Sequence, residues 1–152
     1  MGPIYPGTSF MNGERCFIDS NVLIYAYDQD AGSKRARAGE LLAGLWGSAA
    51  GVVSVQVLQE FFTNATRKLK QPLDLAKARE VVRIYGEWVA APTDPSHVLR
   101  AIDIMQGYQL SFWDSMIVAV AEATQCGILF SEDLQHGQII AGVRVENPFL
   151  TT

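Results

Sequence analysis

The sequence predicts an α/β protein: a three-layer α/β/α sandwich with a central, mainly parallel sheet of four to five strands. Short apolar runs that are typical of buried strands alternate with longer segments whose apolar residues recur at helical spacing. Parallel strands need crossover connections, and the helical segments between the apolar runs supply them. The chain has 152 residues, the length of one domain, and contains no evident internal repeat or interdomain linker. We therefore expect one domain over residues 15–152, preceded by a flexible leader over residues 1–14.

The expected strands are short runs of apolar residues rich in β-branched and aromatic side chains. Pro92 and Pro148 follow the third and the last of these runs, and the missing N–H group of proline is unfavourable inside a sheet. In chain order, the runs are residues 16–19, 52–54, 88–91, 127–130 and 143–145.

Six helices are expected between and beside these strands, and most begin with a recognisable cap. Ser20 or Asn21 is expected to cap the first helix. Ser33 and Asp74 are the expected caps of the second and fourth. In chain order, the helices are residues 22–27, 33–46, 55–67, 75–87, 95–107 and 111–125. The last one carries apolar residues almost all round, which is typical of a helix buried at the centre of a domain.

Composition and charge exclude several classes of protein. No apolar run approaches the roughly 20 residues of a membrane helix, and residues 1–14 lack the basic start and apolar region of a secretion signal. The net charge of −4 argues against a protein that coats nucleic acid through its overall field. Cys16 and Cys126 each begin an apolar run, which indicates buried free thiols rather than a disulfide. We expect a cytoplasmic protein that does not associate with membranes.

Four acidic residues stand beside the apolar runs. Asp19 ends the first strand and Asp133 lies just beyond the fourth, so both fall at the carboxyl edge of the sheet, where ligands of such folds bind. Asp114 lies in the first turn of the most apolar helix, and Glu60 lies off the main apolar stripe of its own helix, free to face a cleft. Carboxylates gathered in this way repel one another unless a cation compensates, and hard ions such as Mg²⁺ or Mn²⁺ prefer oxygen ligands. The placement therefore favours a divalent-metal site.

Other interpretations of these residues remain open. Most acidic residues of a globular domain lie on solvated faces, and Asp114 stands three residues after Ser111, the spacing of a capping box. Two short basic runs are candidates for phosphate contact, although such runs are more often solvated helix faces. They are Lys34, Arg35 and Arg37 in the first run and Arg67, Lys68 and Lys70 in the second.

Four short motifs in this order resemble those of PIN-domain ribonucleases. They are FIDSNVLIY at residues 17–25, QEF at 59–61, FWDSMIVA at 112–119 and LFSEDLQHG at 129–137. More narrowly, the chain is similar over residues 16–149 to VapC-type toxins of bacterial or archaeal toxin–antitoxin pairs. The resemblance implies an α/β/α sandwich and the cleavage of RNA with Mg²⁺ or Mn²⁺. It also implies a homodimer and an antitoxin partner that blocks the site.

The resemblance also implies which residues form the site. Glu132 adjoins Asp133 but ranks below it, because adjacent side chains diverge. The implied catalytic and metal-binding acids are Asp19, Glu60, Asp114 and Asp133, with Ser20, Asn21 and Ser131 as supporting polar residues and Lys34, Arg35 and Arg37 as candidate RNA contacts.

Two further functions compete with this one. A haloacid-dehalogenase-like, Mg²⁺-dependent phosphatase also places an aspartate at the end of its first strand, but it needs a second acid where this chain has Asn21. A PIN-fold interaction domain without metal or catalysis is the other alternative, and retention of all four acids argues against it.

Overall fold

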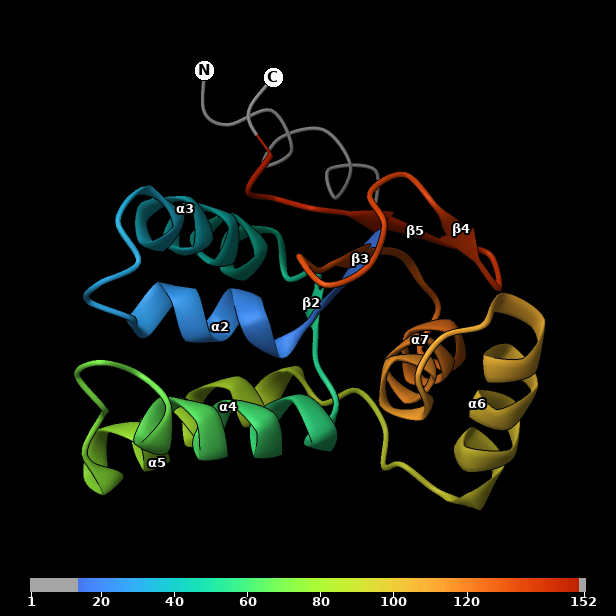
Figure 1. Ribbon diagram of the computed structural model, residues 1–152, viewed down its shortest axis with the longest axis horizontal. Helices are drawn as coiled ribbons and strands as arrows, with labels where there is room; N and C mark the ends of the chain where they lie inside the picture. The colour runs from blue at the N-terminus through green and yellow to red at the C-terminus, as the bar shows by residue number, and fades with distance from the viewer. Residues whose placement is uncertain (1–13, 151–152) are drawn as a thin grey trace.

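The computed structural model describes residues 14–150, in which a five-stranded sheet is flanked by helices on both faces (Figure 1). The strands are β1 (Arg15–Ile18), β2 (Gly51–Val52), β3 (Cys126–Phe130), β4 (Ile139–Ile140) and β5 (Val143–Glu146). Their order is β2-β1-β3-β5-β4; neighbours are parallel, except for the antiparallel pair β4–β5. The expected mainly parallel α/β/α fold is confirmed. The expected leader at 1–14 falls, but for Glu14, outside the described residues.

The helices lie in two groups on either side of the strands (Figure 1). They are α2 (Ser20–Tyr27), α3 (Ser33–Ser48), α4 (Val55–Arg67), α5 (Leu75–Tyr85), α6 (Pro95–Tyr108) and α7 (Phe112–Ala123), with a 3-10 turn, η2, at Gly86–Trp88. On one side α2 packs against α3 and α4, and α4 packs against α5. On the other side α7 packs against β3 and β5 and is covered by α6. No helix within residues 14–150 combines the length and apolar character needed to cross a lipid bilayer.

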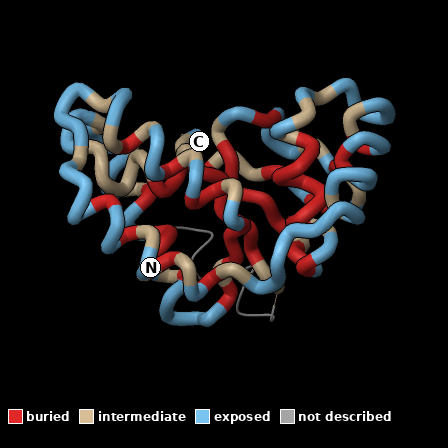
Figure 2. Tube along the Cα trace, turned by 90° about the horizontal axis from the view of Figure 1, so that it is seen from below, coloured by how far each residue is buried: buried red, intermediate tan, exposed pale blue. Residues whose placement is uncertain are grey.

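The central strands are buried, and this burial fixes their register. Phe17 pairs with Val52 on one side and with Leu129 on the other, and Ile18 pairs with Phe130. Figure 2 shows the buried residues concentrated along the middle of the molecule, with the exposed ones on the outer helices. Because β1 and β3 end side by side, the residues that follow them emerge together at one edge of the sheet.

The pattern of α7 is confirmed, since every residue from 115 to 121 is buried. The range predicted for α4 is the observed one, and Asp74 caps α5 by accepting a hydrogen bond from Lys77 N at 2.7 Å. Cys16 and Cys126 are buried free thiols, as expected.

The predicted strand over residues 88–91 is wrong. Trp88 closes the η2 turn, and Val89 makes a single parallel bridge to Val53 rather than a strand. The Trp88 indole packs against the rings of Trp46 and Tyr85, with centroids 4.7 and 4.9 Å away. The short edge strand β4 was not predicted, because its two residues carry no alternating pattern.

Two predicted helix caps are also wrong. The N-cap of α2 is Asp19, whose carboxylate accepts from Ser20 N, so neither Ser20 nor Asn21 takes that role. Gly32 precedes α3 in place of a capping Ser33, with φ at 61°, a conformation that glycine adopts without steric cost.

Gly51 and Gly39 provide a matched test of the packing under Trp88. A Cβ atom at Gly51 would lie 2.6 Å from the Trp88 ring, whereas one at Gly39, inside α3, meets nothing within 4 Å. We expect Gly51→Ala to lower the free energy of unfolding by about 1–3 kcal/mol through overpacking. Gly39→Ala should raise it by roughly 0.5–1 kcal/mol, because alanine favours the helix. Urea denaturation measures both changes, and equal effects of the two substitutions would contradict the packing described.

Candidate active site

Asp19 lies where β1 ends and α2 begins, and its carboxylate is buried, with 4% of the residue exposed. One oxygen, Oδ1, accepts a hydrogen bond from Ser20 N at 2.7 Å. The other, Oδ2, accepts from the hydroxyl of Ser131 at 2.8 Å. Ser131 directly follows β3, so the ends of two neighbouring strands meet at this carboxylate.

The electrostatic surroundings of Asp19 disfavour its charged form. Burial raises the pKa of the Asp19 carboxyl to about 7, although the hydrogen bonds from Ser131 and Ser20 act in the opposite direction. The negative charges of Glu60 and Asp133 raise it further. Near neutral pH, Asp19 is therefore able to hold or release a proton, and a nearby cation would favour its ionised form.

Glu60 reaches this site from α4. Its Oε1 accepts a hydrogen bond from the hydroxyl of Ser20 at 2.9 Å, and its Oε2 accepts from Gln56 Nε2 at 3.0 Å. Gln56 also donates to the carbonyl oxygen of Trp113, in the first turn of α7, at 3.2 Å. Gln56 thus connects α4 to α7 beside the acids. It is absent from the predicted site, although its position one turn before Glu60 was a signal for it.

The loop after β3 is fastened to the first turn of α2 by Asn21. The amide nitrogen of Asn21 donates to Asp133 Oδ2 at 3.1 Å and to Ser131 Oγ at 3.4 Å. The amide oxygen accepts from Glu132 N at 3.2 Å. Ser131 Oγ also accepts from Asp133 N at 3.1 Å. Asn21 and Ser131 therefore set the direction of the Asp133 side chain.

Asp114 completes the group from the first turn of α7. Its backbone N–H donates to Ser111 Oγ at 3.1 Å, so Ser111 is the N-cap, which is one half of the capping box considered for this pair. The residue is half-buried, and burial, with the charges of Asp133 and Glu60, raises the pKa of its carboxyl. Asp19 and Asp114 thus each feel the charges of Glu60 and Asp133, which links the four predicted acids from four separate segments.

The donor chemistry of this group suits a hard divalent cation. All four side chains offer carboxylate oxygens, and the raised pKa values of Asp19 and Asp114 reflect burial and mutual repulsion that a cation would relieve. Between residues 14 and 150, however, no three His, Cys, Asp or Glu side chains stand close enough to form a metal-binding group by themselves. In this arrangement, carboxylate oxygens of Glu60 accept hydrogen bonds from Ser20 and Gln56, and an oxygen of Asp133 accepts one from Asn21.

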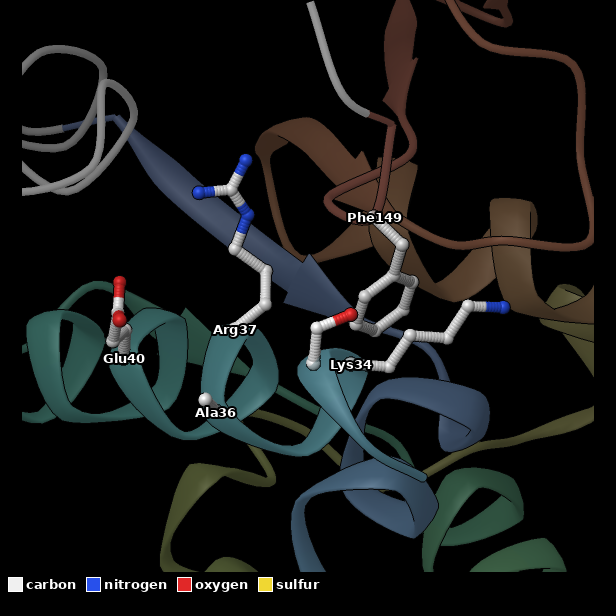
Figure 3. A pocket seen from close by; sticks show the side chains of 6 residues that line it. Lys34, Ala36, Arg37, Glu40 and Phe149 are labelled. Carbon is white, nitrogen blue, oxygen red and sulfur yellow. The ribbon is translucent and has the colours of Figure 1, made fainter. Parts of the chain in front are cut away.

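The three basic residues predicted as RNA contacts lie in different surroundings. Lys34 donates hydrogen bonds to Glu132 and to the hydroxyl of Tyr25. Arg37 donates from Nε to the carbonyl oxygen of Pro148 at 3.0 Å. Figure 3 shows the ring of Phe149 between these two side chains, beside a cavity of about 310 Å³ lined by α3. Arg35 lines another cavity, which it shares with the start of α5. RNA contact by these residues stays a prediction.

The raised pKa of Asp19 gives stability a defined dependence on pH. Its value of about 7 exceeds the ordinary 3.8, so the folded protein holds a proton that the unfolded chain releases. The associated stabilisation is complete below about 3.8 and is lost as the pH rises through about 7. We expect the unfolding free energy of wild type in EDTA to be lower at about pH 8 than at about pH 5. This decrease should exceed that of Asp19→Asn by roughly 1–3 kcal/mol, because asparagine does not titrate. Urea denaturation at both pH values measures this, and parallel behaviour of the two proteins would contradict it.

Comparison with known proteins identifies the family. A family model for the PIN domain matches residues 16–139. Among solved structures, a chain of a toxin–antitoxin complex from Klebsiella pneumoniae superposes with a TM-score of 0.63 at 19% sequence identity, covering 88% of this chain and 98% of that chain. No match was found among curated protein sequences. PIN domains are generally nucleases and use divalent metal ions. Because the family model spans most of the sequence, the chain belongs to the PIN domain family.

Proposed function

We propose that this protein is an endoribonuclease that depends on Mg²⁺ or Mn²⁺ and acts in the cytoplasm as the VapC-type toxin of a toxin–antitoxin pair. One observation carries the proposal: at the carboxyl edge of the sheet, the buried Asp19 and the half-buried Asp114 each feel the charges of Glu60 and Asp133, and the pKa of Asp19 is raised to about 7. Gathering acids in this way costs stability, and that cost is typical of functional sites. Membership of a nuclease family supports the same reaction.

Asp19, Glu60, Asp114 and Asp133 would hold the ion. When bound, a divalent ion supplies positive charge to a phosphodiester and lowers the pKa of water. Ser131 and the backbone N–H of Ser20 orient the Asp19 carboxylate, and Asn21 orients Asp133. A bound cation would lower the pKa of Asp19 and keep its carboxylate ionised at neutral pH. The reaction needs no protein nucleophile, because water attacks the phosphorus.

The phosphatase and the non-catalytic interaction domain are not equally compatible with the structure. The phosphatase alternative lacks support, because the chain belongs to the PIN family and Asn21 is engaged with Asp133 and Ser131 at the position where that chemistry needs an acid. A non-catalytic PIN-fold interaction domain predicts neither ion binding nor cleavage, so the experiment below distinguishes it from the nuclease.

Two protein partners belong to the proposal: an antitoxin that blocks the site and a second copy of this chain. The similar chain from Klebsiella pneumoniae comes from a toxin–antitoxin complex, which supports the first. Large apolar side chains that a partner would cover are exposed at Leu75, Leu99 and Trp113, which supports protein contacts in general.

Asp19→Asn and Asp114→Asn test the nuclease directly. We expect each to lower the rate of RNA cleavage with Mn²⁺ at least about 100-fold, because each removes a carboxylate from the proposed ion site. Cleavage of a labelled RNA by purified protein measures this. Asp103→Asn is the matched control, since it makes the same change on an exposed face of α6 and should retain full activity.

EDTA should abolish wild-type cleavage, and added Mn²⁺ should restore it. If cleavage survives chelation, or if both site variants match Asp103→Asn, the metal-dependent mechanism is wrong. Equal far-ultraviolet circular dichroism spectra of the variants would establish that any loss does not come from unfolding.

The homodimer is tested by mass. Light scattering of the purified chain should give twice the 16.7 kDa of one copy. A single-copy mass across the micromolar concentration range would contradict the dimer, while leaving the nuclease proposal to its own test.

A further inference from the structure

We propose that Tyr25, Lys34 and Glu132 form a positioning network, which holds the loop at residues 131–133 so that Asp133 faces the acidic site. This inference rests on the proposed function, since it assigns the network a role in binding the ion. The three residues come from α2, from the start of α3 and from the loop itself. None of them belongs to the predicted set of catalytic acids.

Glu132 is the centre of the network. Its Oε1 accepts a hydrogen bond from the Tyr25 hydroxyl at 2.5 Å, and its Oε2 accepts from the ammonium group of Lys34. Both oxygens are thus engaged on the side of the loop where α2 and α3 lie, while Asp133 turns to Asn21. Adjacent acids so close to Asp19 repel one another, and the Lys34 charge draws Glu132 away from the group.

The network and the acidic site share one face of α2. Asn21 and Tyr25 are separated by one helical turn, so their side chains lie side by side. Asn21 contacts all three loop residues: the side chains of Ser131 and Asp133 and the backbone of Glu132. Tyr25 extends the same row of contacts by one turn, to the side chain of Glu132. If the outer contact is lost, the loop keeps only the bonds near the start of α2, to Asn21 and to the cap residue Asp19.

The C-terminal segment supports this arrangement from outside. Phe149 meets the Tyr25 ring edge-on, with centroids 4.9 Å apart. The Lys34 ammonium lies 4.8 Å from the centroid of Tyr25 and 5.7 Å from that of Phe149, which is cation–π geometry. The Lys34 side chain is therefore confined among two rings and a carboxylate, unlike an ordinary surface lysine.

Replacing Lys34 should change the affinity for Mn²⁺ in opposite directions, depending on whether Lys34 acts through its charge or by holding the loop. Removing a positive charge near a cation site should by itself tighten the binding of Mn²⁺. If Lys34 acts by holding the loop, Lys34→Met should instead weaken binding. Tyr25→Phe leaves the charge unchanged and keeps the contact with Phe149, so it reports on the hydrogen bonds of the Tyr25 hydroxyl, to Glu132 and from Lys34.

The test is calorimetric titration of metal-free protein with Mn²⁺. We expect Lys34→Met and Tyr25→Phe each to raise the dissociation constant about tenfold, the range found for residues that support metal ligands. Arg100→Met is the matched control. It removes a cation from the Arg100–Glu122 pair, which is about as exposed as the Lys34–Glu132 pair and lies two turns along α7 from Asp114. This variant should change the constant less than about twofold.

A double variant tests whether Lys34 acts through Glu132. If it does, Lys34→Met combined with Glu132→Gln should bind Mn²⁺ about as weakly as Glu132→Gln alone. Hydrogen exchange without metal provides a second measurement, because a released loop should exchange the backbone amides of Glu132 and Asp133 roughly tenfold faster.

Unchanged or tighter Mn²⁺ binding by Lys34→Met and Tyr25→Phe, with unchanged loop exchange, would overturn the inference. Weaker binding by Glu132→Gln, while Lys34→Met and Tyr25→Phe bind Mn²⁺ as wild type does, would also overturn it, because Glu132 would then be a ligand. Failure of the proposed function looks different: Asp19→Asn and Asp133→Asn would then bind Mn²⁺ as wild type does, or wild type would not bind it. In that case the exchange rates still decide whether the network holds the loop.

Discussion

The structure depends most on the buried carboxylate of Asp19. Burying a carboxylate is costly unless hydrogen bonds compensate, and both oxygens of Asp19 accept one, from Ser20 N and from the Ser131 hydroxyl. These two bonds join three elements. Asp19 directly follows β1, caps the helix that comes next and binds the residue that leaves β3. The position of the acid is therefore set by the same contacts that set the crossover from β1 to α2.

Much of the fold was predictable because its signals are local. The bounds of α4 follow from a serine cap and from apolar residues at helical spacing. The helix α7 is predicted by apolar residues on nearly all of its faces. Trp88 shows where local signals fail. Its neighbours Val89 and Ala90 favour a strand, but the indole packs on Gly51, Trp46 and Tyr85, and the backbone turns to permit this. No pattern within the segment records those distant partners.

In the candidate site, too, some features follow from local sequence signals and others do not. The four acids were predictable because each stands at a strand end or a helix start, positions that the fold class brings to one edge. The contacts between them were not, since Gln56 and Lys34 acquire their roles from residues far away in the chain. Asp114 shows that two interpretations of one residue need not compete. Ser111 caps the helix through the Asp114 backbone, while the carboxylate still senses the charges of Glu60 and Asp133.

Three successive residues after β3 make hydrogen bonds to different parts of the protein, which directs the carboxylates of Glu132 and Asp133 to different partners. Ser131 binds Asp19, Glu132 binds Lys34 and Tyr25, and Asp133 binds Asn21. Within residues 14–150, no buried side-chain nitrogen or oxygen lacks a hydrogen-bond partner. An incoming cation must therefore compete with hydroxyl and amide donors for the same carboxylate oxygens. The affinity of the proposed site for its ion would then depend on the difference between the two sets of interactions, so Ser20, Asn21 and Gln56 would contribute to it.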